Sequence, residues 1–509
     1  MLPNSLLRNT SNVARFLCIV PALLCAAARA EEAAEKRPNI LFAIADDWSW
    51  PHASIAGAKF VATPNFDRVA REGVLFENAF CAAPQCSPNR AAILSGRHIW
   101  QLREAGTHSS LFPKDIVVSP DLFEQAGYHI GFTGKGWGPG NWEDSGRHRN
   151  PAGPEFSDLE FDSVPAGIND TDYAANFEAF LEQRPEGAPF YFWYGGKEPH
   201  RGYLKGAGVK AGKRLEDVAL PAFLPEAEDT RSDLLDYGVE VEWFDTQLGK
   251  MIAKLESLGE LDNTIVIVTS DNGMPFPRAK ANVYEYGVHV PLAIRWGAHA
   301  APGRTVKDLF SFFDYAPTLL SAAGIAVPES MTGKSFLPLL IEGVPGPNDF
   351  VLFGRERHSH ARFDNLGYPA RAIRTPEALY IHNLKPDRWP AGDPDAFYDI
   401  DDGPTKGLLV EHQAGYPALY DAAVGKRKEH ELFDVSDSMD CTENLAGEDA
   451  SAETLKALQE KLGTTLAQQG DPRALGKGDV FESYPRFGGM RPKLGGFAKQ
   501  GEYNPKYQE

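Results

Sequence analysis

The sequence predicts an α/β fold, in which a large, mixed but mostly parallel sheet is flanked by helices and followed by a smaller C-terminal α+β subdomain. Short apolar runs rich in β-branched residues alternate with helix-like segments, as is typical of a parallel sheet with crossover helices. Polar residues gather directly after four of these runs, where open α/β sheets place their ligands. Past about residue 365 the segments become shorter and denser in Pro, Gly and Asp, which indicates the second part.

Four strands and four helices can be placed in chain order. Thr63-Pro64 and Ser119-Pro120 look like helix starts with Pro in the first turn, and Gly127 follows the end of the second helix. The predicted strands are 39–45, 128–133, 190–194 and 261–270, and the predicted helices are 64–72, 119–126, 231–258 and 455–466. We expect a catalytic domain over residues 37–365, a subdomain over 366–485 and a poorly structured tail over 486–509.

Length and composition fit a folded protein of more than one part. Of the 509 residues, 43% are hydrophobic and 24% charged, which excludes an intrinsically disordered chain, a collagen and a coiled coil. The 51 Lys and Arg against 70 Asp and Glu give a formal net charge of −19. Because phosphate contacts need Lys and Arg in excess, we expect no nucleic-acid partner.

The first 30 residues have the pattern of a secretory signal. Arg8 and Arg15 form a basic region, the stretch 16–28 is apolar, and Ala28-Arg29-Ala30 has the small-x-small pattern of a cleavage site. The apolar stretch is shorter than the roughly 20 residues of a membrane span, and no later run approaches that length. We therefore expect residues 1–30 to be removed and the mature chain to be periplasmic or secreted, without a membrane span.

Cleavage of the signal would leave three cysteines, Cys81, Cys86 and Cys441. So few cysteines in an exported chain of this length do not make a disulfide framework. The sequence leaves open whether Cys81 pairs with Cys441, and it leaves the oligomeric state open too.

Two oxygen-rich pairs follow two of the predicted strands. Asp46-Asp47 comes directly after strand 39–45, and Asp271-Asn272 comes directly after strand 261–270. Together they offer the oxygen ligands that a hard divalent cation such as Ca²⁺ requires. Asp is common where strands end, so one pair alone is weak evidence, whereas two pairs favour a metal site.

The segment from Cys86 to Arg97 combines a nucleophile with an anion site. Pro88 lies where a helix would begin, so the N–H groups of the first turn point back toward Cys86. Arg90 in that turn can add a bidentate contact to a tetrahedral oxyanion. A nucleophile, an anion pocket and a nearby cation together indicate a hydrolase of anionic esters.

This segment resembles the signature of the type I, formylglycine-dependent sulfatases, in which Cys-x-Pro-x-Arg and Ser/Thr-Gly-Arg are separated by four residues. The resemblance spans roughly residues 37 to 450 and implies an alkaline-phosphatase-like fold and the hydrolysis of a sulfuric ester or sulfamate. Further matching motifs are Asp46-Asp47, Gly134-Lys135-Gly136, Glu198-Pro199-His200, Ser270-Asp271-Asn272-Gly273, the stretch 280–285 and the closing stretches 431–434 and 444–446.

The resemblance implies a chemistry for the site. A separate maturase would oxidise Cys86 to formylglycine, one hydroxyl of the hydrated aldehyde would attack sulfur with the help of Ca²⁺ and Arg90, and loss of a proton from the other would release sulfate. Lys135 and Lys280 would hold the sulfuryl oxygens and His200 would protonate the leaving group. The implied ligands of the one Ca²⁺ are Asp46, Asp47, residue 86, Asp271 and Asn272.

One position departs from the family pattern. Many sulfatases have Gly-Lys-x-His, with the histidine contacting the gem-diol, whereas this chain has Trp137 two residues after Lys135. Either another histidine serves, with His98, His148 and His289 as candidates, or the diol loses its proton to a different base.

Within the family the chain resembles the N-sulfoglucosamine sulfohydrolase (heparan sulfamidase) branch, in the stretches 271–277, 282–284, 353–358, 369–371 and 382–384. This implies exo-acting removal of the N-sulfate from a terminal glucosamine of heparin- or heparan-type glycans. Lys280 and Trp137 depart from that branch. The expected substrate contacts are Glu198, Arg355, Glu356, His358 and Arg371.

Three alternatives stay open. The first is an enzyme that acts on a carbohydrate O-sulfate of another polysaccharide. The second is an enzyme that acts on phosphorus, as a phosphonate monoester hydrolase or phosphodiesterase. The third is an inactive, carbohydrate-binding relative, which requires Cys86 to remain a thiol. The reaction products distinguish the active alternatives: an N-sulfate yields a free amine, an O-sulfate yields a free hydroxyl, and a phosphorus substrate yields no sulfate.

Overall fold

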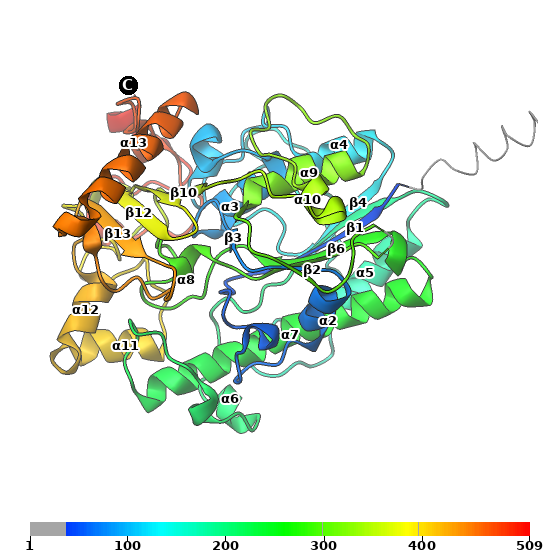
Figure 1. Cartoon of the computed structure of the whole chain (residues 1–509), viewed down its shortest axis with the longest axis horizontal. Coiled ribbons are helices and arrows are strands. Elements are labelled where there is room, and N and C mark those ends of the chain that lie inside the picture. The colour runs from blue at the N-terminus through cyan, green and yellow to red at the C-terminus, as the bar shows by residue number, and fades with distance from the viewer. Residues whose placement is uncertain (1–36, 298, 395, 509) are drawn as a thin grey trace, which may run out of the picture. The chain divides into compact units, whose positions relative to one another are not determined.

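The computed structural model of the chain describes residues 37–297, 299–394 and 396–508 (Figure 1). The predicted secretory signal, residues 1–30, lies outside the described residues. Within the described ranges, none of the helices combines the length and the apolar character that a membrane crossing needs.

A seven-stranded sheet forms the centre of the predicted catalytic domain, in the order β4-β5-β1-β6-β7-β2-β8. The first four strands of this order are parallel, β7 is antiparallel to both of its neighbours, and β8 is parallel to β2. The predicted large, mixed and mostly parallel sheet is thus confirmed. Its strands are β1 (Asn39–Ala45), β2 (Val74–Phe76), β4 (His129–Gly134), β5 (Phe190–Gly195), β6 (Thr264–Ser270), β7 (Leu292–Arg295) and β8 (Arg304–Val306).

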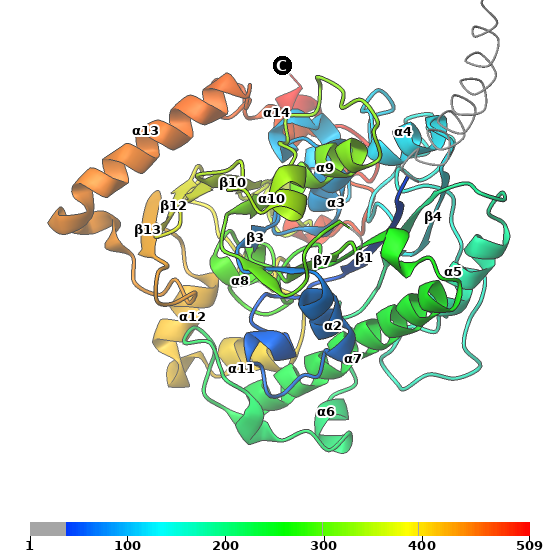
Figure 2. The same cartoon turned by 45° about the vertical axis from the view of Figure 1, so that its right-hand side comes forward.

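Helices cover both faces of this sheet, so the central strands are buried on both sides. Successive residues of β1 belong to opposite apolar clusters, Phe42 and Ile44 to one and Leu41 and Ala43 to the other. This two-sided burial explains why the strands are continuous apolar runs. One face carries α3 (Cys86–Ser95), α4 (Ser119–Gln125) and α9 (Tyr315–Ala322), and the other carries α2 (Pro64–Glu72), α5 (Tyr173–Glu182) and α7 (Glu228–Ser257) (Figures 1 and 2).

The predicted elements agree with the observed ones to within a few residues. The largest difference at a strand is at β6, which begins at Thr264 rather than at residue 261. Residues Leu261–Asn263 form a 3₁₀ turn instead. The hydroxyl of Thr264 closes this turn by donating to the carbonyl of Glu260 at 2.8 Å, so the chain enters the sheet only afterwards.

A second, antiparallel sheet of four strands has the order β10-β11-β12-β13. Helix α13 (Ala452–Gln468), predicted over 455–466, packs against β11 and β12. The strands are β10 (Val351–Arg355), β11 (Ala370–Arg374), β12 (Ala378–Asn383) and β13 (His430–Asp434). This sheet begins before residue 365, and the predicted domain boundaries stay predictions. The remaining elements are β3 (Ala79–Phe80) paired with β9 (Phe310–Ser311), α6 (Ala207–Lys210), α8 (Glu285–Val288), α10 (Leu337–Glu342), α11 (Pro404–Glu411), α12 (Pro417–Val424) and α14 (Val480–Ser483).

The segment 486–508 is not the poorly structured tail that its composition predicts. The backbone N–H of Phe487 donates to the carbonyl of Ser109 at 2.7 Å, and the carboxylate of Asp364 accepts from the N–H of Phe497 at 2.8 Å. The segment has little regular structure of its own, so no periodicity marks it in the sequence. Contacts with distant parts of the chain hold it in place.

Candidate active site

The two predicted metal-binding pairs lie side by side at the carboxyl edge of the sheet. Strands β1 and β6 are parallel neighbours in register, with Ala45 opposite Ser270, so the residues that follow them meet. The N–H of Asp47 donates to Asp271 Oδ1 at 3.1 Å, and Asn272 Nδ2 donates to Asp47 Oδ1 at 2.6 Å. Asp47 has a φ of 81°, a left-handed conformation that Asp tolerates better than most residues.

Cys86 is the first residue of α3 and faces this acidic group. Its Sγ lies 3.3 Å from Asp46 Oδ1. Arg90, one turn later, is fully buried, and its Nε donates to Asp271 Oδ2 at 2.8 Å while Nη1 donates to the carbonyl of Lys135 at 2.6 Å. The predicted nucleophile, the predicted arginine and the two acidic pairs therefore form one cluster.

This cluster fits a bound cation. The carboxylates of Asp46, Asp47 and Asp271 and the Cys86 thiol offer ligand atoms that all lie within 4.8 Å of one another. Asn272 Oδ1 is a buried acceptor for which the described residues supply no hydrogen-bond donor. Burial, reinforced by Asp46, raises the pKa of Asp47 to about 7 and that of Asp271 to about 6. A divalent cation would offset the free-energy cost of keeping these buried carboxylates ionised, and an oxygen-rich donor set suits Ca²⁺.

Two lysines stand at the cavity side of the acidic cluster. Lys135, which follows β4, places Nζ 2.5 Å from Asp46 Oδ2. Lys280 places Nζ 2.6 Å from Asp47 Oδ2 and 3.1 Å from Asp401 Oδ2. Burial opposes the charge of Lys280, but Asp401 and Asp47 outweigh it and raise its pKa well above the usual value. Lys280 is therefore a fixed positive charge at neutral pH.

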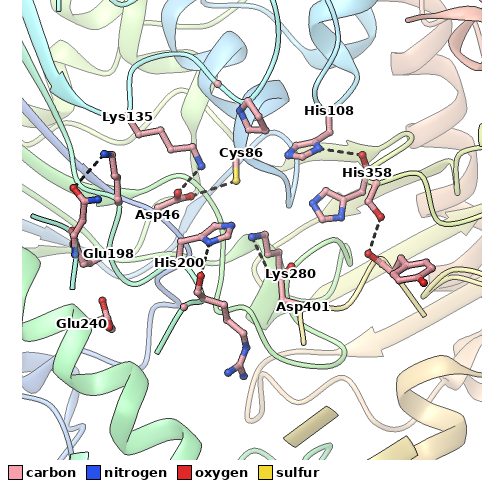
Figure 3. Close-up of a pocket in the computed structure, with 18 of the residues that line it drawn as sticks. Asp46, Cys86, His108, Lys135, Glu198, His200, Glu240, Lys280, His358 and Asp401 are labelled. Carbon is pink, nitrogen blue, oxygen red and sulfur yellow. Dashed lines mark hydrogen bonds and ion pairs between the residues drawn. The ribbon is translucent and has the colours of Figure 1, made fainter. Parts of the chain in front are cut away.

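A cavity of about 700 Å³ joins these groups to the surface (Figure 3). Asp47, Arg90, Asp271 and Asn272 are not among its lining residues and lie buried behind the wall. The predicted site residues that line it are Asp46, Cys86, Lys135, Glu198, His200, Lys280 and His358.

Three of the predicted sugar contacts are elsewhere. Arg355, Glu356 and Arg371 are almost completely buried and are not among the residues that line the cavity. Arg371 bridges Glu356 at 2.8 Å and Asp471 at 2.8 Å, and Arg355 pairs with Asp399 at 2.8 Å. The Arg371 pair holds the second sheet to the C-terminal part of the chain, and the Arg355 pair holds it to the connection between β12 and β13. In the sequence these residues look like a charged loop because their partners are distant.

The structure also shows which histidines are available. His108, His200 and His358 line the cavity, and the three candidates from the sequence do not. His98 stacks on Trp100 and His289 is bonded to Glu285, and His148 is exposed. Trp137, at the departing position, is buried and donates from Nε1 to the carbonyl of Ser87 at 3.0 Å, so it supports the first turn of α3.

Sequence reasoning missed His108, Asp401, Arg486 and Arg491, all of which line the cavity. None of them belongs to a motif or follows a predicted strand of the main sheet. They reach the cavity on connecting segments, so no local pattern could have found them.

Adding Ca²⁺ is expected to raise the melting temperature, because the ion would bind three carboxylates that only the fold brings together. At a free Ca²⁺ concentration about 100 times Kd, the folded state gains about 2.7 kcal/mol. Differential scanning calorimetry of chelator-treated protein with and without Ca²⁺ measures this. Asp271→Asn keeps the side-chain shape and should lose most of the gain. An equal gain in that variant would contradict a site at these residues.

The fold is a mixed α/β sheet flanked by helices, and at the carboxyl edge of that sheet Cys86 lies beside an acidic cluster that fits a cation and contacts two lysines. The chain belongs to the sulfatase family, whose model, described as "Sulfatase", matches residues 38–325. It is thus an enzyme that hydrolyses sulfate esters or sulfamate.

Three comparisons show how far the similarity extends. The chain is 28% identical to N-sulphoglucosamine sulphohydrolase of Homo sapiens, over 91% of this chain and 97% of that protein. It is 28% identical to an ulvan-active sulfatase of Formosa agariphila, over 81% of this chain and 79% of that protein. A solved structure of a protein in complex with its substrate D-glucosamine-2-N,6-O-disulfate has a TM-score of 0.63 at 22% identity, and the match covers 86% of this chain and 99% of that one. The last comparison supports the fold.

Among the described residues, Cys81, Cys86 and Cys441 are all free and buried. The question of a Cys81–Cys441 disulfide, left open by the sequence, is thus answered against pairing in this structure. Cys81 Sγ instead contacts the carbonyl of Gly287 at 3.8 Å.

Proposed function

We propose that this sulfatase removes the N-sulfate from a terminal glucosamine of a heparin- or heparan-type glycan. The observation that carries the proposal is the position of Cys86 in the wall of a sugar-sized cavity, between Asp46 and the two lysines (Figure 3). The relative N-sulphoglucosamine sulphohydrolase, matched over 97% of its length, supports the sulfamate.

The chain's own residues bind the sulfate and stabilise its charge. Lys135 and Lys280 would take the sulfuryl oxygens, where negative charge develops as the bond breaks, and Arg90 would fix residue 86 and Asp271 behind them. Asp46, Asp47, Asp271, Asn272 and residue 86 would hold Ca²⁺. As formylglycine, made by a maturase, residue 86 would supply a hydrated aldehyde oxygen as nucleophile, and Ca²⁺ would supply positive charge beside it.

We assign the proton-accepting role of the missing family histidine to His108. Its Nδ1 lies 3.1 Å from the carbonyl of His358, and because a carbonyl only accepts, Nδ1 carries the hydrogen and Nε2 keeps a free lone pair. Burial, His358 and nearby Arg486, Lys280 and Lys135 lower the pKa of His108 well below its usual value, so the ring is neutral and its Nε2 is unprotonated. Figure 3 shows the opposite edge of the ring turned toward Cys86.

His200 is placed to serve the leaving group. Its Nδ1 lies 3.1 Å from the carbonyl of Arg201, which orients the ring, and the side chain lines the cavity beside Lys280, below Cys86 in the view of Figure 3. The positive charge of Lys280 lowers the pKa of His200. A bound sulfate would offset the charge of Lys280 and so favour the protonated, acid form.

The deciding experiment is hydrolysis of glucosamine N-sulfate by Ca²⁺-loaded protein whose mass confirms formylglycine at residue 86. We expect sulfate and free amine in equal yield. Sulfate released only from O-sulfated sugars would replace the N-sulfate proposal by the second candidate, a carbohydrate O-sulfatase, which the ulvan-active relative favours. Phosphate release from a phosphonate or phosphate ester, without sulfate release, would contradict both.

Export to the periplasm or medium, predicted from residues 1–30, is part of this proposal and is checked by N-terminal sequencing of the mature protein.

A further inference from the structure

The C-terminal segment brings two arginines into the wall of the active-site cavity. Arg486 and Arg491 line the same cavity as Cys86, on the side of His108 and His358. The hydrogen bond from Phe487 to Ser109 and those to Asp364 anchor this segment, so the two side chains are held there by the fold.

Arg486 is a buried cation without an acidic partner. It is 7% exposed, and its Nη1 donates to the carbonyl of His358 at 2.7 Å. Among the described residues, no carboxylate lies within ion-pairing distance of it. Asp399, whose charge acts on Arg486, is already paired with Arg355 and Arg362, each at 2.8 Å. Burial and the neighbouring Arg357 and Arg491 lower the pKa of Arg486 to about 9, so its charge is costly in this environment and an anion would offset the cost.

Arg491 is oriented in the same way, by groups that carry no negative charge. Its guanidinium lies 4.1 Å from the centroid of the Tyr398 ring, and Nη1 donates to the carbonyl of His360 at 3.1 Å. Its backbone N–H donates to His360 Nδ1 at 2.8 Å. No carboxylate in the described part of the chain forms an ion pair with it. A stacked, pre-oriented guanidinium leaves its remaining N–H groups available to a planar or tetrahedral oxyanion.

The surroundings make this arrangement unusual for the chain. The protein carries a formal net charge of −19, and most of its buried arginines have acidic partners, as Arg355 and Arg371 do. The acidic residues Glu198 and Glu240 lie on the other side of the cavity from His108 and His358 (Figure 3). Asp401, which also lines the cavity, is paired with Lys280 at 3.1 Å. The cavity therefore has a cationic wall beyond the two lysines that the reaction uses.

We propose that Arg486 and Arg491 form a second anion subsite, which binds a sulfate or carboxylate group carried elsewhere on the sugar substrate whose scissile sulfate lies at Cys86. This rests on the proposed function for the position of the scissile group. It deepens that function by naming the substrate class: a sugar with two anionic groups.

Binding to a variant that cannot turn over its ligand tests the subsite. In the Cys86→Ala background, isothermal titration calorimetry compares glucosamine N-sulfate with two doubly anionic ligands. Glucosamine-2-N,6-O-disulfate carries the second charge as a sulfate, and a disaccharide of N-sulfoglucosamine and a uronic acid carries it as a carboxylate. We expect at least one of them to bind about tenfold more tightly than the monosulfate, as one charge-assisted pair would provide.

Adding Arg491→Gln should remove that tenfold preference and change the affinity for glucosamine N-sulfate by less than about twofold. Lys493→Gln is the matched control, because it removes the same charge two residues away, at a side chain that does not line the cavity, and should keep the preference. Arg486→Gln is the second variant. It should act like Arg491→Gln if it folds, and Arg491, which is only partly buried, carries the test if it does not.

A preference that survives Arg491→Gln, or equal affinities for all three ligands in the Cys86→Ala protein, would overturn the subsite. The binding test of the subsite can succeed or fail independently of the sulfate-release test of the proposed function. A preference that depends on Arg491, in an enzyme that releases no sulfate from glucosamine N-sulfate, supports the subsite and rejects the N-sulfate assignment.

Discussion

Cys86→Ala is expected to abolish sulfate release while leaving the fold intact. Removing a catalytic nucleophile costs roughly 10⁴- to 10⁶-fold in rate. The thiol makes one polar contact, 3.3 Å to Asp46, so its loss removes little that holds the structure. Initial rates of sulfate release measure the effect, and circular dichroism checks the fold. Cys81→Ala, a change of the same kind at a buried thiol outside the cavity, should keep its activity.

Cys86→Ser separates formylglycine chemistry from that of a simple hydroxyl. Serine keeps an oxygen at the position of Sγ, but a sulfated serine is a stable ester with no second hydroxyl to expel the sulfate. We expect at most one sulfate transferred per protein, seen as a mass increase of the tryptic peptide that contains residue 86. Wild-type turnover by the serine variant would contradict a formylglycine mechanism.

Lys280→Ala is expected to lower kcat by roughly 10²- to 10³-fold, the size of effect seen when a group that stabilises transition-state charge is removed. Its Nζ lies between Asp47 at 2.6 Å and Asp401 at 3.1 Å, so the variant also leaves two carboxylates without their shared cation. Stopped assays of sulfate release over a range of substrate concentrations give kcat and KM separately.

Lys280→Arg keeps the charge and should recover a large part of kcat, and Lys205→Ala, at an exposed side chain, should change neither constant. An unchanged kcat in Lys280→Ala would remove this lysine from the catalytic group. If Lys280→Arg were as slow as Lys280→Ala, the role of Lys280 would depend on its shape as well as its charge.

The sequence predicted those features whose signal is local. The strand before Asp46 and the strand before Asp271 are apolar runs with a sharp polar end, and Pro88 and Arg90 follow Cys86 at fixed spacing on one helix. Parallel strands bring their carboxyl ends to one edge, so these local patterns also predicted that the pairs meet. The observed hydrogen bond from the N–H of Asp47 to Asp271 shows that the two pairs do lie together.

Only the tertiary structure decided which charged residues face the cavity. Arg355, Glu356 and Arg371 are interior because Asp399, Asp471 and Arg473, far along the chain, neutralise them. A buried charge is costly unless it is paired, and the fold, not the neighbouring sequence, determines which residue is the partner. Arg486 and Arg491 show the converse. They belong to no recognisable sequence pattern, yet in the folded chain they line the active-site cavity without an acidic partner. Their proposed ability to bind an anion therefore depends on an environment that only the tertiary structure creates.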